Sequence, residues 1–150
     1  MHISWSFLDK RKAAISAVEA YTSMDYIVKN SAEEIERAET KMAGVGSPNM
    51  DGMPHAHNPQ AAEDRIIKGI EEIDTIKERY RQAVEYMNWF KPAWAQLSED
   101  EQYVLEVFYM DECDSPVVLV EDYFGIERSS AYNKKNRALD HLTMLLYGKA

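Results

Sequence analysis

The 150-residue sequence lacks the features that would mark an enzyme, a membrane protein or a disulfide-bonded protein. Its single cysteine, Cys113, excludes an intramolecular disulfide, and no apolar run approaches the roughly 20 residues that span a bilayer. Residues 1–12 show no secretory-signal pattern, so we expect a cytoplasmic protein that does not bind membranes. No phosphate-binding glycine motif and no Ser/His/Asp arrangement is present, so we expect neither an enzyme nor a cofactor.

Basic residues are absent from one long stretch of an already acidic chain. Residues 99–127 carry ten acidic residues and no Lys or Arg, and the net charge of the whole chain is −9. From Arg128 onward the balance reverses, with five basic residues against one acidic residue, Asp140. DNA affinity comes largely from neutralised phosphates, which an acidic body repels. Any nucleic-acid contact should therefore be local and should use the basic C-terminal segment.

Apolar residues recur every seven positions in two segments, which predicts two long helices. The first helix should run from about Phe7 to Ala43. The second should be capped by Asn58, begin at Pro59, and end or kink at Pro92. The first repeat comprises Ala14, Tyr21, Val28, Ile35 and Met42, with Ala17, Met24 and Ala38 three positions later. The second comprises Ile66, Ile73, Tyr80, Met87 and Trp94, flanked by Ile70, Ile76 and Val84.

The segment between these helices, residues 44–58, contains three Gly and two Pro, which rules out a continuous helix. We therefore expect a long antiparallel hairpin, as a domain spanning residues 1–92 that serves oligomerisation or partner binding. His55 and His57 lack a second ligand pair, so we expect no metal site there. The hairpin should pack on the C-terminal region through Trp89, Phe90 and Trp94.

Shorter helices are predicted in a second domain, residues 93–150, which makes the expected fold all-α. Ser98 and Glu101 form a capping box at the first of them. Ser115 and Pro116 begin a short helix that ends at Gly125. The last helix should run from about residue 127 to residue 146 and stop at Gly148, and its core face comprises Ala131, Ala138, Leu142 and Leu145.

This last helix has the features of a helix that reads the major groove of DNA, and it follows a glycine turn and a short helix, as in a helix-turn-helix. It combines an apolar anchoring face with short polar groups on the opposite face and flanking cations. Arg can fork onto guanine, Asn onto adenine, and Ser onto several base edges. The predicted DNA contacts are Arg128, Ser129, Tyr132, Asn133 and Asn136, with Lys134 and Arg137 suited to phosphates.

Several motifs carry a resemblance to a known family. They are residues 97–105, Phe108-Tyr109, Phe124-Gly125-Ile126, Tyr132, and residues 137–142. In these motifs the chain resembles the promoter-reading region 4 of bacterial sigma factors. More specifically, it resembles the small sigma-like regulators of phages and prophages, of the RinA and ArpU type. Those proteins place a long helical region and a Gly-Met-Pro loop, here residues 50–55, ahead of the same unit.

The resemblance implies a transcriptional regulator of phage or mobile-element genes that binds promoters. It implies DNA contact at Arg128, Ser129, Ser130, Tyr132 and Asn133. Three positions depart from the family pattern and are acidic or aromatic: Glu127 replaces the usual Ser cap, Glu121 a usually small residue, and Phe108 a frequently basic one.

We expect double-stranded DNA as the partner, RNA polymerase as a further one, and a homodimer or higher homo-oligomer formed through the long helices. About four phosphate contacts per unit give a salt slope of only about −3.6, so two half-sites should be engaged together. Two alternatives stay open. One is a phage DNA-packaging component resembling a small terminase subunit, and the other is a protein-interaction module with a degenerate helix-turn-helix.

Overall fold

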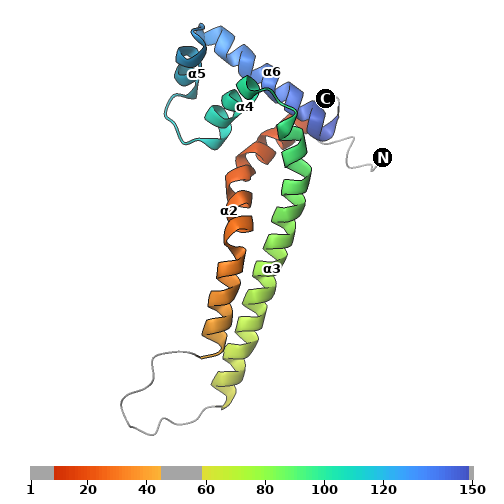
Figure 1. The fold of residues 1–150 in the computed structure, drawn as a ribbon, viewed down its shortest axis with the longest axis vertical. Helices are drawn as coiled ribbons and strands as arrows, with labels where there is room; N and C mark the ends of the chain where they lie inside the picture. The colour runs from red at the N-terminus through yellow and green to blue at the C-terminus, as the bar shows by residue number, and fades with distance from the viewer. Residues whose placement is uncertain (1–8, 45–58, 149–150) are drawn as a thin grey trace. The chain divides into compact units, whose positions relative to one another are not determined.

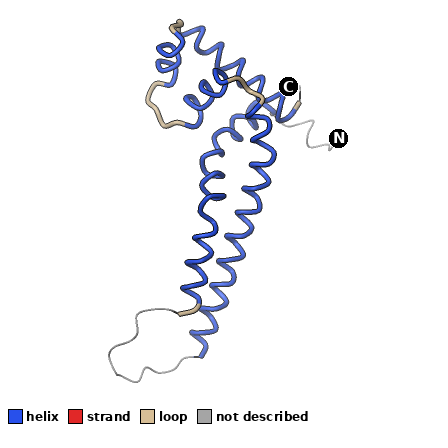
Figure 2. The backbone as a smooth tube through the Cα atoms, in the orientation of Figure 1, coloured by secondary structure: helices blue, strands red, loops and turns tan. Residues whose placement is uncertain are grey.

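The computed structural model of the chain describes residues 9–44 and 59–148, and this part is all-helical, as predicted (Figures 1 and 2). No β-strand occurs in these two ranges. None of the described helices is both long enough and apolar enough to cross a bilayer. The elements are α2 (Lys10–Met42), α3 (Pro59–Ala95), α4 (Glu99–Leu105), the π-helix η1 (Glu106–Met110), α5 (Pro116–Phe124) and α6 (Arg128–Tyr147).

Several expectations fall on residues outside the described ranges. The Asn58 cap, the His55 and His57 pair, and the residue 50–55 motif are among them. The observed helices otherwise match the predicted ones closely. The first helix was expected over residues 7–43 and the last over 127–146, within three residues of the observed bounds at each end.

The described residues form two compact units. One combines the residues up to 24 with those from 85 onward, and the other comprises residues 25–84. Both long helices, α2 and α3, therefore contribute to both units. These contact-based units do not test the predicted domains, 1–92 and 93–150, which stay a prediction.

The first unit contains a large apolar core built around Phe90. This ring is fully buried, and its centroid lies 5.2 Å from that of Tyr86 and 5.5 Å from that of Trp94. Trp89 lies beside this core, with its ring centroid 5.4 Å from that of Tyr147 in α6. Residues from α2, α3, α4 and α6 complete the buried cluster, among them Ala14, Val18, Leu97, Leu105, Leu139 and Leu142.

A second cluster in the same unit holds α5 against α6. Val120 of α5 and Ala131 of α6 are both fully buried, together with Val104, Val107 and Val117. The capping box before α4 is confirmed: the Glu101 N–H donates to Ser98 Oγ at 3.2 Å, and the Ser98 N–H donates to Glu101 Oε1 at 3.1 Å. Ser115 precedes α5 as expected, but its side chain makes no capping hydrogen bond.

The second unit has a much smaller core. Ala38, Ile73 and Ile76 form its buried apolar cluster, and Ile35 and Met42 pack against it half-buried. Gly69 of α3 is also buried, and a Cβ added there would lie 2.8 Å from the Cγ of Met42. The absence of a side chain at Gly69 therefore permits the close approach of the two helices at this point.

The predicted apolar face of the first long helix is confirmed, whereas that of the second is partly wrong. All eight residues predicted for the face of α2 are buried or half-buried. On α3, however, Ile66, Ile70 and Tyr80 are 45%, 49% and 43% exposed. Ile73, Ile76 and Met87 are buried as predicted, and a second seven-residue repeat of α3, Gly69, Ile76, Ala83 and Phe90, is buried throughout.

The proline in α3 does not end the helix. We expected Pro92 to end or kink it, but α3 continues to Ala95. Pro92 itself is exposed, while Phe90 before it and Ala93 after it are buried in the core of the first unit. Burial of these neighbours offsets the backbone hydrogen bond that proline cannot donate.

Candidate nucleic-acid interface

A left-handed glycine joins α5 to α6. Gly125 has φ 64°, a conformation that other residues adopt only at a cost in free energy, and its N–H donates to the carbonyl of Glu121. The Ile126 N–H donates to the same carbonyl at 3.1 Å. Because Val120 before this turn and Ala131 after it are buried in one cluster, the side of α6 that faces the protein is fixed.

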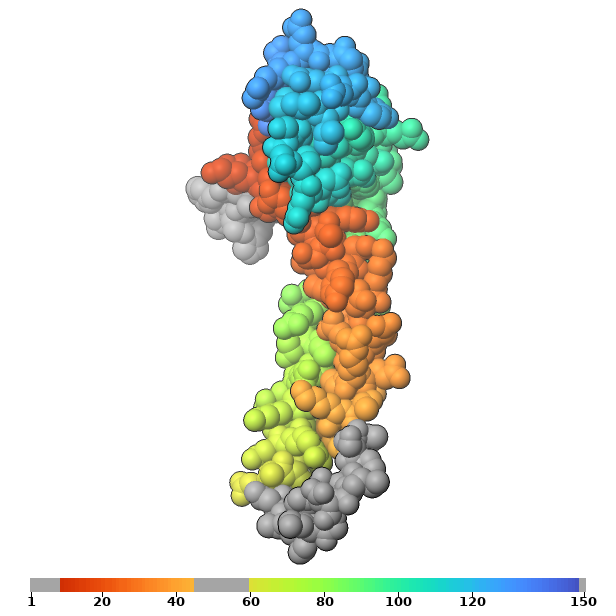
Figure 3. Space-filling view, turned by 90° about the vertical axis from the view of Figure 1, so that its left-hand side faces the viewer, coloured from red at the N-terminus to blue at the C-terminus, as the bar shows by residue number. Residues whose placement is uncertain are grey.

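The opposite side of α6 is open to solvent. Ala131, Ala138 and Leu142 are buried, as predicted, and Leu145 is half-buried. The space-filling view shows the atoms of α5 and α6 at the surface, in cyan and blue (Figure 3). Of the predicted DNA contacts, Lys134 and Asn136 are half-buried, and the exposed ones are Arg128, Ser129, Ser130, Tyr132, Asn133 and Arg137.

Three cations of α6, Arg128, Lys134 and Lys135, make cation–π contacts with aromatic rings. The guanidinium of Arg128 lies 5.8 Å from the centroid of the Tyr132 ring, and the Nζ of Lys135 lies 5.3 Å from the same centroid. Phe108 packs against Tyr132 at 6.1 Å and also contacts Lys135. Cation–π contacts of this kind contribute about 0.5–1 kcal/mol at exposed sites. They restrict the side chains before any ligand binds.

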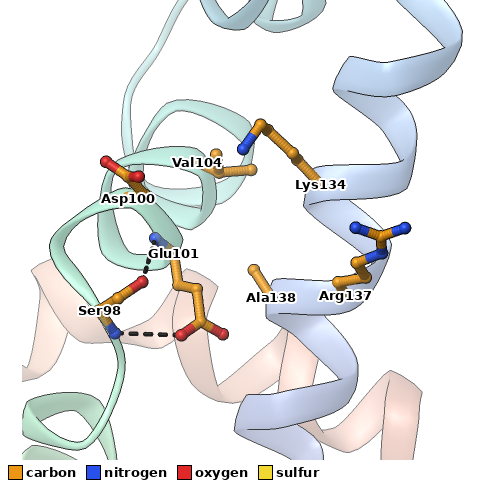
Figure 4. A pocket seen from close by; sticks show the side chains of 7 residues that line it. All are labelled: Ser98, Asp100, Glu101, Val104, Lys134, Arg137 and Ala138. Carbon is orange, nitrogen blue, oxygen red and sulfur yellow. Dashed lines mark hydrogen bonds between the residues drawn. The ribbon is translucent and has the colours of Figure 1, made fainter. Parts of the chain in front are cut away.

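A further cation lies near the joint with α5. The Nζ of Lys134 is 4.4 Å from the centroid of the Phe124 ring. Lys134 and Arg137 also line a cleft of about 290 Å³ between α4 and α6, with Asp100 and Glu101 on the α4 side (Figure 4). The cleft combines both charges, so a strongly anionic ligand would meet repulsion as well as attraction there.

Glu101 connects the cleft to the helix cap. Its Oε2 lies 2.8 Å from Nδ1 of His141 in α6, while its Oε1 accepts the Ser98 N–H. Burial raises the pKa of Glu101, but hydrogen bonds from Ser98 and His141 outweigh that effect and hold the pKa below its usual value. The carboxylate therefore stays charged and fastens α4 to α6.

Glu127 and Glu121, the two acidic residues that differ from the sigma-like pattern, lie at the turn that leads into α6 and in α5 before it. Glu127 is the residue before the helix, is exposed, and makes no side-chain capping bond. Its charge suits a helix N-terminus but opposes phosphate. Glu121 is half-buried, and its backbone carbonyl accepts both turn N–H groups.

Hydrophobic spacing did not predict the π-helix η1. The Asp111 N–H reaches the carbonyl of Glu106, five residues earlier, at 2.8 Å. This wider turn buries Val107 in the second cluster and leaves Phe108 half-buried against Tyr132. The aromatic support of the α6 cations therefore depends on a local geometry that hydrophobic periodicity does not encode.

The sequence-based prediction also missed Arg11 of α2. Its Nη2 donates to Oδ1 of Asn136 at 2.8 Å, and its Nη1 lies 3.8 Å from Asp140. The triplet Lys10-Arg11-Lys12 was the available signal, because three consecutive cations are unusual in so acidic a chain. One of the two lone pairs on the Oδ1 of Asn136 is thus occupied by Arg11.

Known proteins offered no match against which to compare this site. Models of protein families, curated proteins and solved structures all gave no significant similarity to the chain. Within the described residues, no three His, Cys, Asp or Glu side chains lie close enough together to hold a metal ion.

Proposed function

We propose that the chain is a sequence-specific DNA-binding regulator of phage or mobile-element transcription, without catalytic activity. In this proposal α5, the Gly125 turn and α6 form the helix-turn-helix, and α6 enters the major groove. The observation that carries it is the solvent-open face of α6, where exposed Ser129 and Asn133 are flanked by cations on a chain of net charge −9. Asn can bond adenine bidentately, and exposed Arg128 can fork onto guanine.

The proposed binding mode uses two chains. One unit with few phosphate contacts binds weakly, and a dimer that engages two half-sites multiplies the affinity. The second unit offers an apolar face for pairing, because Ile66, Ile67 and Ile70 are each about half exposed. This face supports a homodimer through the long helices. Light scattering distinguishes it from the ring-sized mass expected of a packaging component that resembles a small terminase subunit.

The proposal is tested by titrating the protein into a fluorescent duplex taken from the DNA upstream of its own gene, with a scrambled duplex as competitor. Arg128→Ala and Asn133→Ala should each weaken specific binding by about 5- to 150-fold, the range for loss of one bidentate base contact. Arg37→Ala and Asn88→Ala are matched controls at exposed positions of α2 and α3. Unchanged affinity in both α6 variants would refute the assignment.

A second candidate function is protein binding by a degenerate helix-turn-helix. The observation that favours it is an exposed apolar surface on α5, formed by Val118, Leu119 and Tyr123, within the acidic stretch of residues 99–127. Purified RNA polymerase is the partner to test. Binding that Leu119→Asp abolishes, combined with no retardation of any duplex, would support this function over DNA binding.

A further inference from the structure

Arg11 is bound to the same stripe of α6 that the proposed function places in the groove. Its two contacts, Asn136 and Asp140, continue the stripe that begins with Ser129 and Asn133. The spacings along this stripe are four, three and four residues, so these side chains share one face of the helix. The first turn of α2 therefore adjoins the DNA-facing stripe at its C-terminal end.

Arg11 also changes the charge of that face. Asp140 is the single acidic residue within α6, and its exposed carboxylate would repel a phosphate. The guanidinium of Arg11 neutralises it while remaining 46% exposed itself. A guanidinium carries five N–H donors, and the two contacts to α6 leave others directed elsewhere.

Three consecutive cations begin α2. Lys10, Arg11 and Lys12 occupy its first turn, which contains no acidic residue, and Asp9 immediately before the helix accepts the Lys12 N–H at 3.1 Å. The cations are themselves unfavourable at this end, because the helix dipole is positive there, and one carboxylate offsets only part of three charges. A phosphate close to this turn would complement the remaining positive charge.

We propose that Arg11 binds a backbone phosphate of the DNA, so that the interface extends from α6 onto the first turn of α2. In the same contact Arg11 orients the amide of Asn136 toward the groove. This inference rests on the proposed function, and it adds to the interface a residue of a helix outside the helix-turn-helix.

The test is the salt dependence of binding to the upstream duplex. Each phosphate contact contributes about 0.9 to the slope of log K against log salt. Arg11→Ala should therefore make the slope shallower by about 0.9 and weaken binding at 0.1 M salt by about 8-fold. Arg37→Ala is the control, because it removes the same charge from the same helix. Arg37 is paired with Glu33, and its removal should leave the slope unchanged. Arg11→Lys should retain most of the slope.

Two results for Arg11→Ala would contradict a phosphate contact. Weaker binding of Arg11→Ala with an unchanged slope would show that Arg11 acts only by holding Asn136, which overturns the phosphate contact. Unchanged binding would overturn it as well. If Arg11→Ala fails to fold, the double variant Arg11→Gln/Asp140→Asn, which leaves no unpaired charge, gives the same slope comparison. If the wild-type protein binds no duplex, the proposed function fails and this inference fails with it. If Arg128→Ala weakens binding and Arg11→Ala does not, the proposed function holds and only the Arg11 inference fails.

Discussion

The two units of this chain differ in how they use the same helices. In the first, α2 and α3 contribute to a core with fully buried Phe90, Leu105, Leu139 and Leu142. In the second, the buried cluster comprises Ala38, Ile73 and Ile76, and large apolar side chains stay exposed. Because stability follows the apolar area removed from water, the first unit should be stable alone and the second should depend on a partner. Burial thus separates a unit with a large core from a unit with a small core and exposed apolar side chains.

The largest expected effect comes from emptying the larger core. Phe90→Ala should destabilise the protein by about 3–5 kcal/mol, because it removes a fully buried ring that contacts Tyr21, Tyr86 and Trp94. Ile73→Ala in the second unit should cost about 2 kcal/mol, at the low end for such changes, since its surroundings are more open. Urea denaturation followed by circular dichroism compares them. Equal losses would contradict the difference between the units.

The next effect concerns assembly. Replacing Ile66 and Ile70 by Glu should weaken self-association by about 3 kcal/mol per dimer, or roughly 150-fold, because four half-exposed isoleucines would lose their burial. Monomer stability should change by less than about 0.5 kcal/mol, as for other surface substitutions.

Sedimentation equilibrium measures this change. Met144→Glu is a matched control, since Met144 is similarly exposed on α6 in the first unit. A mass that stays dimeric in the double variant would place the assembly surface elsewhere.

The close helix approach in the second unit gives a smaller effect. Gly69→Ala should cost about 1–3 kcal/mol, because the new Cβ would lie within 2.9 Å of the Cβ of Met42 and the helices must separate. Gly125→Ala should cost about 1 kcal/mol for a different reason: nothing lies near its added Cβ, but its φ of 64° disfavours alanine. If Met42→Gly, which removes every clashing atom, relieves the defect of Gly69→Ala but not that of Gly125→Ala, the steric origin is established. A thermal denaturation series provides the readout.

The last effect is a dependence of the protein's stability on pH. The pKa of Glu101 is lowered in the folded protein, so its contribution is fully present above the unfolded pKa of about 4.3 and is lost as the pH falls through the folded value. Glu101→Gln should cost about 1–2 kcal/mol at pH 7, because it removes a charged hydrogen bond to His141. This difference should disappear on acidification.

Glu78 of the second unit is the control for that measurement. Hydrogen bonds from Arg81 and Gln82 lower the pKa of Glu78 to about 2. Both Glu78 and Arg81 are nevertheless exposed, and solvent screening makes such pairs weak. Glu78→Gln should therefore leave the unfolding curve unchanged at every pH. A larger loss for Glu78→Gln than for Glu101→Gln would contradict the assignment of the stabilising carboxylate hydrogen bonds to the first unit.

The sequence predicted the helices well because their ends carry chemical signals. Ser98 with Glu101, Pro116 and Gly125 all appear at or beside the expected boundaries. The buried face of α3 was harder to predict, since two members of its repeat, Gly69 and Ala83, carry little hydrophobic signal. The predicted repeat has the same seven-residue spacing, and its Ile73 and Met87 are buried, but its larger Ile66 and Tyr80 are exposed. Side-chain size therefore indicated only part of the buried face.

In the candidate site as well, the sequence predicted local features but not contacts between distant residues. Local spacing was sufficient to predict that Ser129 and Asn133 lie opposite Ala131 and Ala138 on α6. It could not predict Arg11 beside Asn136, because that contact joins residues 125 positions apart. Nor could it predict that Phe108 supports Lys135, which depends on the π-helical turn of η1.

Contact between the polar face of α6 and DNA bases can be observed at the asparagine side chains themselves. Two-dimensional NMR follows their side-chain amide signals while the upstream duplex is added. If α6 lies in the groove, the Asn133 and Asn136 amides should shift strongly, and those of Asn30 and Asn88, on α2 and α3, should stay unchanged. Saturating duplex that leaves the Asn133 amide unshifted, or that shifts all four amides equally, would contradict it.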